Sequence, residues 1–281
     1  MTELTSRELL VHLYQTAVDA VDGRQLVQQW CRENSSSTFS HCIAIGKAAS
    51  AMLQGALDSR HSINSALLIT TRENVTRGLK RNYKVTIVES AHPVPEQSSL
   101  DAGNTLLQYL DAIPRHASLL VLISGGTSSM VEVPVYGMSL TQLQQVNQYL
   151  IASGKDIHAI NAWRKRFSKI KGGGLLGYVQ HLQCTQLIIS DVQDNDPAVI
   201  GSGLLVQSKV DKHDGDEWLQ SQLLNESPHV DIYAPLNTHV IGSNDVALRA
   251  VIEKAADHGL DHYLHKEFIS GDAIEQGRVI G

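Results

Sequence analysis

Four stretches of this sequence carry residues that could bind an anion or move a proton. Lys47 follows an apolar run directly, and a second apolar run ends in the sequence SGGTSS (124–129). A third run leads into HPVP (92–95), and a fourth ends at Asp191. Glycines leave backbone NH groups open to an anion, ammonium and hydroxyl groups add donors, and a carboxylate can hold Mg²⁺ or accept a proton. Together the four stretches predict an anion-binding site.

Each stretch also has a simpler interpretation that the sequence leaves open. Lys47 stands at the first turn of an expected helix, where the helix dipole is already positive; a bound anion would explain it, and so would a solvated side chain. The glycine pair of 124–129 also suits a tight turn. Asp191, Asp194 and Asp196 could hold Mg²⁺ beside phosphates or cap a turn.

A basic segment offers cations for an anionic ligand. Three glycines follow it, and its basic residues are Arg164, Lys165, Arg166, Lys169 and Lys171. Arg164 and Lys171 are seven positions apart, a spacing that would place both on one helix face, directed at a crevice. A solvated helix face is the alternative, but in a chain with a net charge of -6 this local positive charge favours a small anionic substrate.

The elements that must position these residues follow from the apolar pattern. Short runs rich in β-branched residues predict buried strands at 41–46, 65–70, 84–90, 118–124 and 185–191. Helical spacing predicts helices at 8–21, 47–58, 97–113, 139–154 and 161–170. Ser139 with Gln142 is an expected capping box, and Gly154 an expected helix end. This alternation indicates an α/β fold with a parallel sheet, whose ligands bind beyond the carboxyl ends of the strands.

Length and composition exclude several classes of protein. At 281 residues the chain is long enough for about two domains. No apolar run is long enough to span a bilayer and the first residues do not form a secretory signal, so we expect a cytoplasmic protein with no membrane partner. Cys31, Cys42 and Cys184 have no CxxC spacing, which argues against disulfides and a zinc site. The acidic charge and 5% aromatic content argue against nucleic acid as a partner.

Several stretches, in the same order, resemble the signature sequences of the glycerate 2-kinase family. They are IAIGKAASAM (43–52), AHPVPEQSSLDAG (91–103), LLVLISGGTSSMVEVPVYGMSL (119–140), LIASGKDIHAIN (150–161), RKRFSKIKGG (164–173) and IISDVQDNDPAVIGSG (188–203). Members of this family, some of them labelled hydroxypyruvate reductase, carry a kinase-like domain followed by a MOFRL domain. The resemblance covers about residues 8–260. It implies a Rossmann-like, mostly parallel sheet with helices on both faces, and transfer of a phosphoryl group from ATP, with Mg²⁺, to the 2-hydroxyl of D-glycerate.

The resemblance also implies roles for individual residues. Lys47 matches a lysine that steadies the transferring phosphoryl group. Asp191 matches a candidate metal ligand or general base, and Asp196 is a second candidate metal ligand. The residues implied in nucleotide or substrate binding are Ser124, Gly125, Gly126, Thr127, Ser128, Asn161, Arg164 and Lys171. Phosphoryl transfer needs mainly positioning and charge neutralisation, which suits these residue types.

The sequence departs from the family pattern inside these same loops. Thr127 stands where a third glycine is usual, and its β-carbon would crowd a phosphate. Gly174 replaces an arginine, which removes donors suited to a carboxylate or phosphate. Asp194-Asn195 replaces a usual Gly-Asp, and Leu204-Leu205 a usual Pro-Thr.

The domain organisation predicted from the resemblance is a kinase-like domain at 1–236 and the beginning of a truncated second domain at 237–281. The resemblance implies that the second domain supplies a glycine-rich stretch and an arginine that faces Lys47 across the ligand cleft. Without them, we expect that wall of the cleft to come from a homo-oligomer or a separate partner. A degenerate homologue that only binds nucleotide or a small hydroxy acid is the alternative. An NAD-dependent hydroxypyruvate reductase is the weakest reading, because no GxGxxG motif follows an expected strand.

Overall fold

The computed structural model describes residues 5–59, 62–82, 84–155, 157–207, 215–223, 236–264 and 272–280. The chain divides into two compact units. The larger unit is Val21–Ser243, and the smaller combines Met1–Ala20 with Asn244–Gly281. All residues of the predicted site belong to the larger unit.

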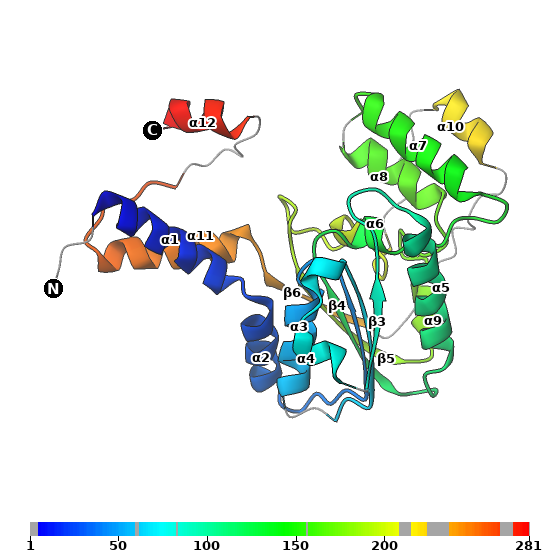
Figure 1. The fold of residues 1–281 in the computed structure, drawn as a ribbon, viewed down its shortest axis with the longest axis horizontal. Coiled ribbons are helices and arrows are strands. Elements are labelled where there is room, and N and C mark those ends of the chain that lie inside the picture. The colour runs from blue at the N-terminus through cyan, green and yellow to red at the C-terminus, as the bar shows by residue number, and fades with distance from the viewer. Residues whose placement is uncertain are drawn as a thin grey trace. The chain divides into compact units, whose positions relative to one another are not determined.

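The larger unit is built on a six-stranded sheet with the order β3-β2-β1-β4-β5-β6 (Figure 1). The strands are β1 (His41–Ile45), β2 (Ser65–Thr70), β3 (Val85–Glu89), β4 (Ser118–Ile123), β5 (Gln183–Ile189) and β6 (Leu236–Gly242). Every neighbouring pair is parallel. The predicted α/β fold is confirmed, and each of the five strands expected from apolar runs is present.

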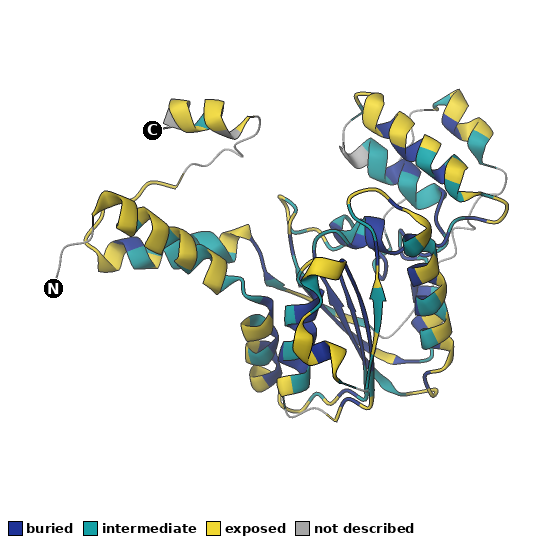
Figure 2. Cartoon of the chain, in the orientation of Figure 1, coloured by how far each residue is buried: buried dark blue, intermediate teal, exposed yellow. Residues whose placement is uncertain are grey.

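Both faces of the central strands β1, β2 and β4 are covered, which explains why these strands read as continuous apolar runs (Figure 2). Along β1, Ile43 and Ile45 pack into the core on the side of α5 (Gln97–Asp111) and α9 (Leu176–Val179). Cys42 and Ala44 point the other way, into a core with α2 (Gly23–Glu33) and α3 (Ala49–Asp58). Short helical turns complete this body: α4 (Arg77–Lys80), α6 (Thr127–Met130), η1 (Arg72–Asn74) and η2 (Ile200–Ser202).

Three helices form a cap beyond the carboxyl ends of the strands (Figure 1). They are α7 (Leu140–Ala152), α8 (Ile157–Arg166) and α10 (Glu217–Gln222). The cap has a small core of its own, which includes Leu143, Trp163, Phe167 and Leu219. The predicted capping box between Ser139 and Gln142 begins α7, as expected.

The helix expected at 161–170 lies earlier in the chain, because α8 ends at Arg166. The prediction that Arg164 and Lys171 share a helix face is therefore wrong. Lys171 instead follows α8 in a turn that contains the positive-φ glycines Gly172 and Gly173, which a helix does not accommodate.

The smaller unit contains α1 (Ser6–Ala20), α11 (Asn244–Asp257) and α12 (Ala273–Ile280). Within it α1 packs along α11, and the rings of His12 and His258 meet edge to face with centroids 5.8 Å apart. The domain division at 236/237 stays a prediction. In the part of the chain that the structure describes, no helix is long and apolar enough to cross a membrane.

Candidate functional site

The ends of β1 and β4 are joined by backbone hydrogen bonds at the point where the strand order reverses. The NH of Lys47 donates to the carbonyl of Gly125 (2.9 Å), and the NH of Ser124 donates to the carbonyl of Ile45 (3.1 Å). The hydroxyl of Ser124 accepts a further bond from the NH of Ala48 (3.1 Å). Ligands of open parallel sheets bind at this reversal. The exposed side chain of Lys47 lies next to this junction of β1 and β4.

The buried side chain of Thr127 adds hydrogen bonds between the ends of β1 and β4. Its side chain is fully buried, and its hydroxyl lies 3.0 Å from the carbonyl oxygen of Ile45 and 2.7 Å from that of Ser124, to which it donates. The side chain therefore ties β1 to β4 instead of facing a ligand, and the expected crowding of a phosphate does not follow from its position. A role for Thr127 in ligand binding stays a prediction.

Gly125 and Gly126 let two other polar groups approach the loop closely. A β-carbon on Gly125 would collide with the carboxylate of Asp191 at the end of β5, and one on Gly126 would lie 3.0 Å from Cδ2 of His92. His92 comes from the HPVP stretch after β3. The glycine pair thus brings ends of separate strands together, which a loop with larger side chains would hold apart.

A pocket of about 180 Å³ opens between this loop and the helical cap. Its lining residues are His92, Pro93, Pro95, Gly126, Ser128, Ser129, Asn147, Arg164 and Lys171. Four of the residues predicted from sequence, Gly126, Ser128, Arg164 and Lys171, therefore meet at one cavity. Arg164 and Lys171 reach it although they do not share a helix.

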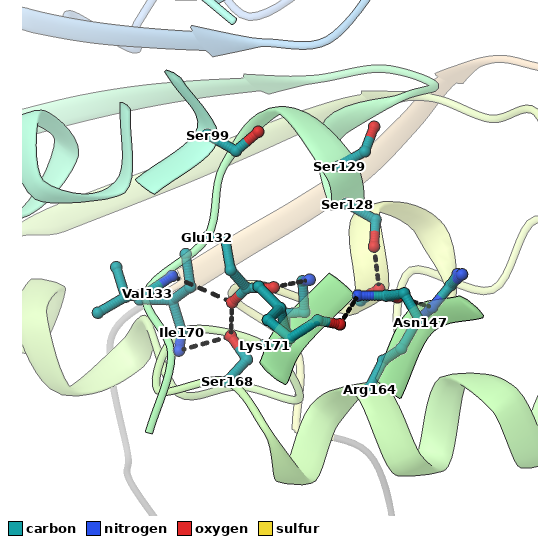
Figure 3. Close-up of polar contacts among 12 residues, drawn as sticks. Ser99, Ser128, Ser129, Glu132, Val133, Asn147, Arg164, Ser168, Ile170 and Lys171 are labelled. Carbon is teal, nitrogen blue, oxygen red and sulfur yellow. Dashed lines mark hydrogen bonds and ion pairs between the residues drawn. The ribbon is translucent and has the colours of Figure 1, made fainter. Parts of the chain in front are cut away.

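Arg164 is held in place by Asn147 of α7 (Figure 3). Its Nε donates to Oδ1 of Asn147 (3.0 Å), and Nδ2 of Asn147 donates to the carbonyl of Leu143 (2.9 Å). Burial lowers the pKa of Arg164, and the negative charge of Glu132 opposes this shift. Arginine stays protonated in proteins, so Arg164 carries a positive charge at the pocket.

Lys171 forms an ion pair with Glu132, and both side chains are buried (Figure 3). Nζ of Lys171 contacts Oε2 of Glu132. The other carboxylate oxygen accepts hydrogen bonds from the hydroxyl of Ser168 (2.5 Å) and the NH of Val133 (3.0 Å). Buried charges persist only when paired and hydrogen-bonded in this way.

Serine hydroxyls complete the wall formed by α6. The hydroxyls of Ser128 and Ser202 lie 2.7 Å apart and share a hydrogen bond, and the hydroxyl of Ser129 donates to the carbonyl of Gly126 (3.1 Å). Ser128 is half-buried and lines the pocket, so its oxygen can serve both Ser202 and a ligand.

His92 links the pocket to the strand ends. Burial lowers the pKa of His92, and the positive charge of Lys47 lowers it further. The carboxylates of Asp191 and Glu73 act in the opposite direction. Lys47 and Asp191 thus both lie within electrostatic reach of His92, whose lowered pKa leaves its imidazole neutral near pH 7.

Other predicted residues lie apart from the cavity. Asn161 is half-buried on α8 and is not among the residues that line the pocket. Asp196 is exposed, and its Oδ1 accepts from the NH of Ala198 (2.9 Å), as a turn cap does. Among the described residues, no three His, Cys, Asp or Glu side chains form a group that could hold a metal ion. Asp191, itself exposed, would thus need phosphate and water oxygens to complete a Mg²⁺ shell.

The position of Gly174 explains one departure from the family pattern. A β-carbon there would collide with the carbonyl oxygen of Lys169, because the NH of Leu175 turns back to bond the carbonyl of Ile170 (3.1 Å). An arginine at position 174 would require this turn to open.

Sequence reasoning placed the HPVP stretch at the site without a specific role for His92, and it assigned no role to Glu132, Asn147 or Ser202. For Glu132 a signal was present, since it is the lone charge in the apolar stretch MVEVPV (130–135). A charge in a segment that must be buried requires a partner. Asn147 and Ser202 had no such signal, because their roles depend on partners that are far along the chain.

Comparison with known proteins agrees with this architecture. Residues 9–236 match a family model described as "Domain of unknown function (DUF4147)". A putative hydroxypyruvate reductase of Agrobacterium vitis is 32% identical over 257 residues, which are 86% of this chain and 66% of that protein. A glycerate 2-kinase of Pyrococcus horikoshii is 29% identical over 284 residues, 94% of this chain and 63% of that protein. The chain thus spans somewhat less than two thirds of the length of these relatives.

The fold also matches a solved structure. The crystal structure of a glycerate kinase from Thermotoga maritima superposes with a TM-score of 0.75 at 24% sequence identity, covering 89% of this chain and 62% of that one. This agreement establishes the fold, and the family model covers most of the chain. The chain therefore belongs to the DUF4147 family, that of the glycerate 2-kinases which its signature stretches resemble.

Proposed function

We propose that this chain carries the acid-binding and phosphoryl-transfer residues of a glycerate 2-kinase, which moves the γ-phosphoryl group of ATP to the 2-hydroxyl of D-glycerate. One observation carries the proposal. A small pocket that contains Arg164 and serine hydroxyls lies beside strand ends that bear Lys47 and Asp191. The first group suits a carboxylate, and the second suits the charges of a transferring phosphoryl group.

The residues have distinct tasks in this reaction. Arg164 holds the substrate carboxylate, and Ser128 contacts a hydroxyl group. The 2-hydroxyl oxygen forms a bond to the γ-phosphorus while the bond from that phosphorus to the bridging oxygen breaks, and ADP leaves. Lys47 neutralises charge on the transferring group. The hydroxyl proton passes to Asp191 or to His92, whose lowered pKa leaves its imidazole neutral and able to accept it.

Mg²⁺ fits the site in the manner usual for nucleotide-dependent enzymes, which bind it through one or two carboxylates together with phosphate oxygens. Asp191 would hold the ion, with Asp196 as the second predicted carboxylate. When bound, Mg²⁺ neutralises charge on the phosphates. Among the described residues no preformed cage exists, so the ion would enter with the nucleotide.

The test is ATP consumption by the full chain with D-glycerate and Mg²⁺, with the phosphorylated position identified by NMR. Lys47→Ala should abolish turnover. Lys80→Ala, at an exposed lysine of α4, is the matched control and should retain it. Binding of ATP and D-glycerate without turnover would support the degenerate homologue. Oxidation of NADH with hydroxypyruvate would support the reductase instead.

A cytoplasmic location stays a prediction, as does the expectation that a homo-oligomer or a separate partner supplies a second wall of the cleft. A specific activity that increases with protein concentration would support the oligomer.

A further inference from the structure

The pocket has an unusual charge count. Three of its lining residues are ionisable, namely His92, Arg164 and Lys171. The charge of Lys171 is already matched by Glu132, which lies behind the pocket wall and is 1% exposed. His92 is neutral near pH 7 because burial lowers its pKa.

Among the described residues, Arg164 is therefore the one cation of this lining that forms no ion pair, and the carboxylate of Glu132 acts on it only from a distance. The group it contacts is Asn147, a neutral amide, which uses its oxygen for Nε of Arg164 and its nitrogen for the carbonyl of Leu143. Nε is thereby occupied, and the two terminal nitrogens of the guanidinium, which bond to none of the described residues, are left for a ligand. Their fork geometry matches one carboxylate.

Because the pocket is partly buried, the net charge of a ligand decides how well it binds there. A monoanion bound to Arg164 leaves the pocket neutral, whereas a dianion leaves one buried negative charge without a partner. Such a charge is costly in a site of low dielectric constant. The volume of about 180 Å³ is below the range of drug-sized ligand sites, which suits an acid of a few carbon atoms.

We propose that Glu132 is a specificity-determining residue: by neutralising Lys171 it restricts the pocket to small monocarboxylates and disfavours dicarboxylates. This inference rests on the proposed acid-binding role of the pocket. Glu132 acts through Lys171 and is a positioning residue, without contact to the substrate. The anchors for this role are Ser168 and the NH of Val133, which fix the carboxylate against the lysine.

The test compares two probes of nearly equal shape in calorimetric titrations of the full chain at pH 7.5, without ATP. D-glycerate is a monoanion, and tartronate carries a second carboxylate in place of the hydroxymethyl group. The unaltered chain should bind D-glycerate at least tenfold more tightly than tartronate. Glu132→Gln should shift this ratio at least tenfold toward tartronate, since Lys171 then lacks its counter-charge.

Two variants separate charge from structure. The double variant Glu132→Gln/Lys171→Met removes both charges and should restore the preference for D-glycerate. Asp111→Asn removes one negative charge from the exposed end of α5 and should leave the ratio unchanged. If Glu132→Gln fails to fold, Ser128→Lys adds an unpaired cation to the same lining while Glu132 stays in place, and it should shift the ratio in the same direction.

The inference is overturned if the unaltered chain binds tartronate as tightly as D-glycerate or binds neither probe. It is also overturned if Glu132→Gln, or Ser128→Lys in its place, leaves the ratio unchanged, or if the double variant does not restore it. Because the titrations contain no ATP, a chain without kinase turnover can still show the expected selectivity. Conversely, turnover without selectivity would remove this inference and leave the proposed function standing.

Discussion

The carboxylate of Asp191 lies directly against Cα of Gly125, so that any side chain at position 125 would collide with it. Gly125 is also the acceptor for the NH of Lys47, at 2.9 Å. One residue without a side chain thus sets the spacing between the lysine after β1 and the aspartate after β5. The geometry proposed for phosphoryl transfer depends on this contact.

Gly125→Ala should reduce ATP-dependent turnover about 100-fold, because the new methyl group displaces Asp191 and a misplacement of about 1 Å has an effect of this size. Steady-state kinetics with D-glycerate would measure it. Gly277→Ala is the matched control, since a β-carbon there meets no atom within 4 Å. Equal rates for the Gly125 variant and the unaltered chain would show that Asp191 takes no part.

Glu132→Ala should lower the free energy of unfolding by about 3–5 kcal/mol, because it leaves Lys171 buried without its counter-charge. Urea denaturation followed by circular dichroism would measure the change. The control is Arg24→Ala, which breaks the exposed pair with Asp58 and should cost about 0.2–1 kcal/mol. Similar losses in both variants would mean that the Glu132–Lys171 pair is not buried in solution.

The pKa of His92 should respond in opposite directions to the loss of its two charged neighbours. Lys47 lowers this pKa and Asp191 raises it, so Lys47→Ala should raise the pKa and Asp191→Asn should lower it further. NMR titration of the imidazole would record both shifts. Shifts in the same direction would contradict the arrangement of the three residues.

The same histidine makes folding stability depend on pH. The pKa of His92 in the folded chain lies below the unfolded value of 6.5, so the unfolded chain binds a proton more readily. Its contribution to stability is present above pH 6.5 and is lost as the pH falls through the folded pKa. His92→Gln should reduce the loss of stability as the pH falls below about 6.5, measured by urea denaturation at each pH.

Thr127→Val should destabilise the chain by about 1–3 kcal/mol, because the carbonyl groups of Ile45 and Ser124 lose a buried donor while the volume hardly changes. Thr127→Ser keeps the hydroxyl and should recover part of this loss. Thermal unfolding of the three proteins would show the order, and a valine variant as stable as the serine variant would count against the hydrogen bonds.

The sequence by itself determined five of the six strands of the sheet. It missed β6, an edge strand that is mostly not buried and so lacks a continuous apolar run. The apolar runs of β1, β2 and β4 predict buried parallel strands because both of their faces must be covered, and this requirement is local to each run. The start of α7 was equally predictable, since the capping box joins Ser139 to Gln142, three residues away. The meeting of the polar strand ends at one site was also predictable, because parallel strands bring their carboxyl ends to one edge of the sheet.

Only the tertiary structure decided how charge is distributed in the pocket. Glu132 and Lys171 are 39 positions apart, and Asn147 and Arg164 are 17 apart. No periodic pattern links such pairs. The placement of Lys171 on a helix face failed because α8 ends at Arg166, and the two cations meet through a turn and the cap helices instead. Pairing between buried groups depends on packing across the whole fold, so the sequence could supply the charges while the fold determined which of them remained unpaired.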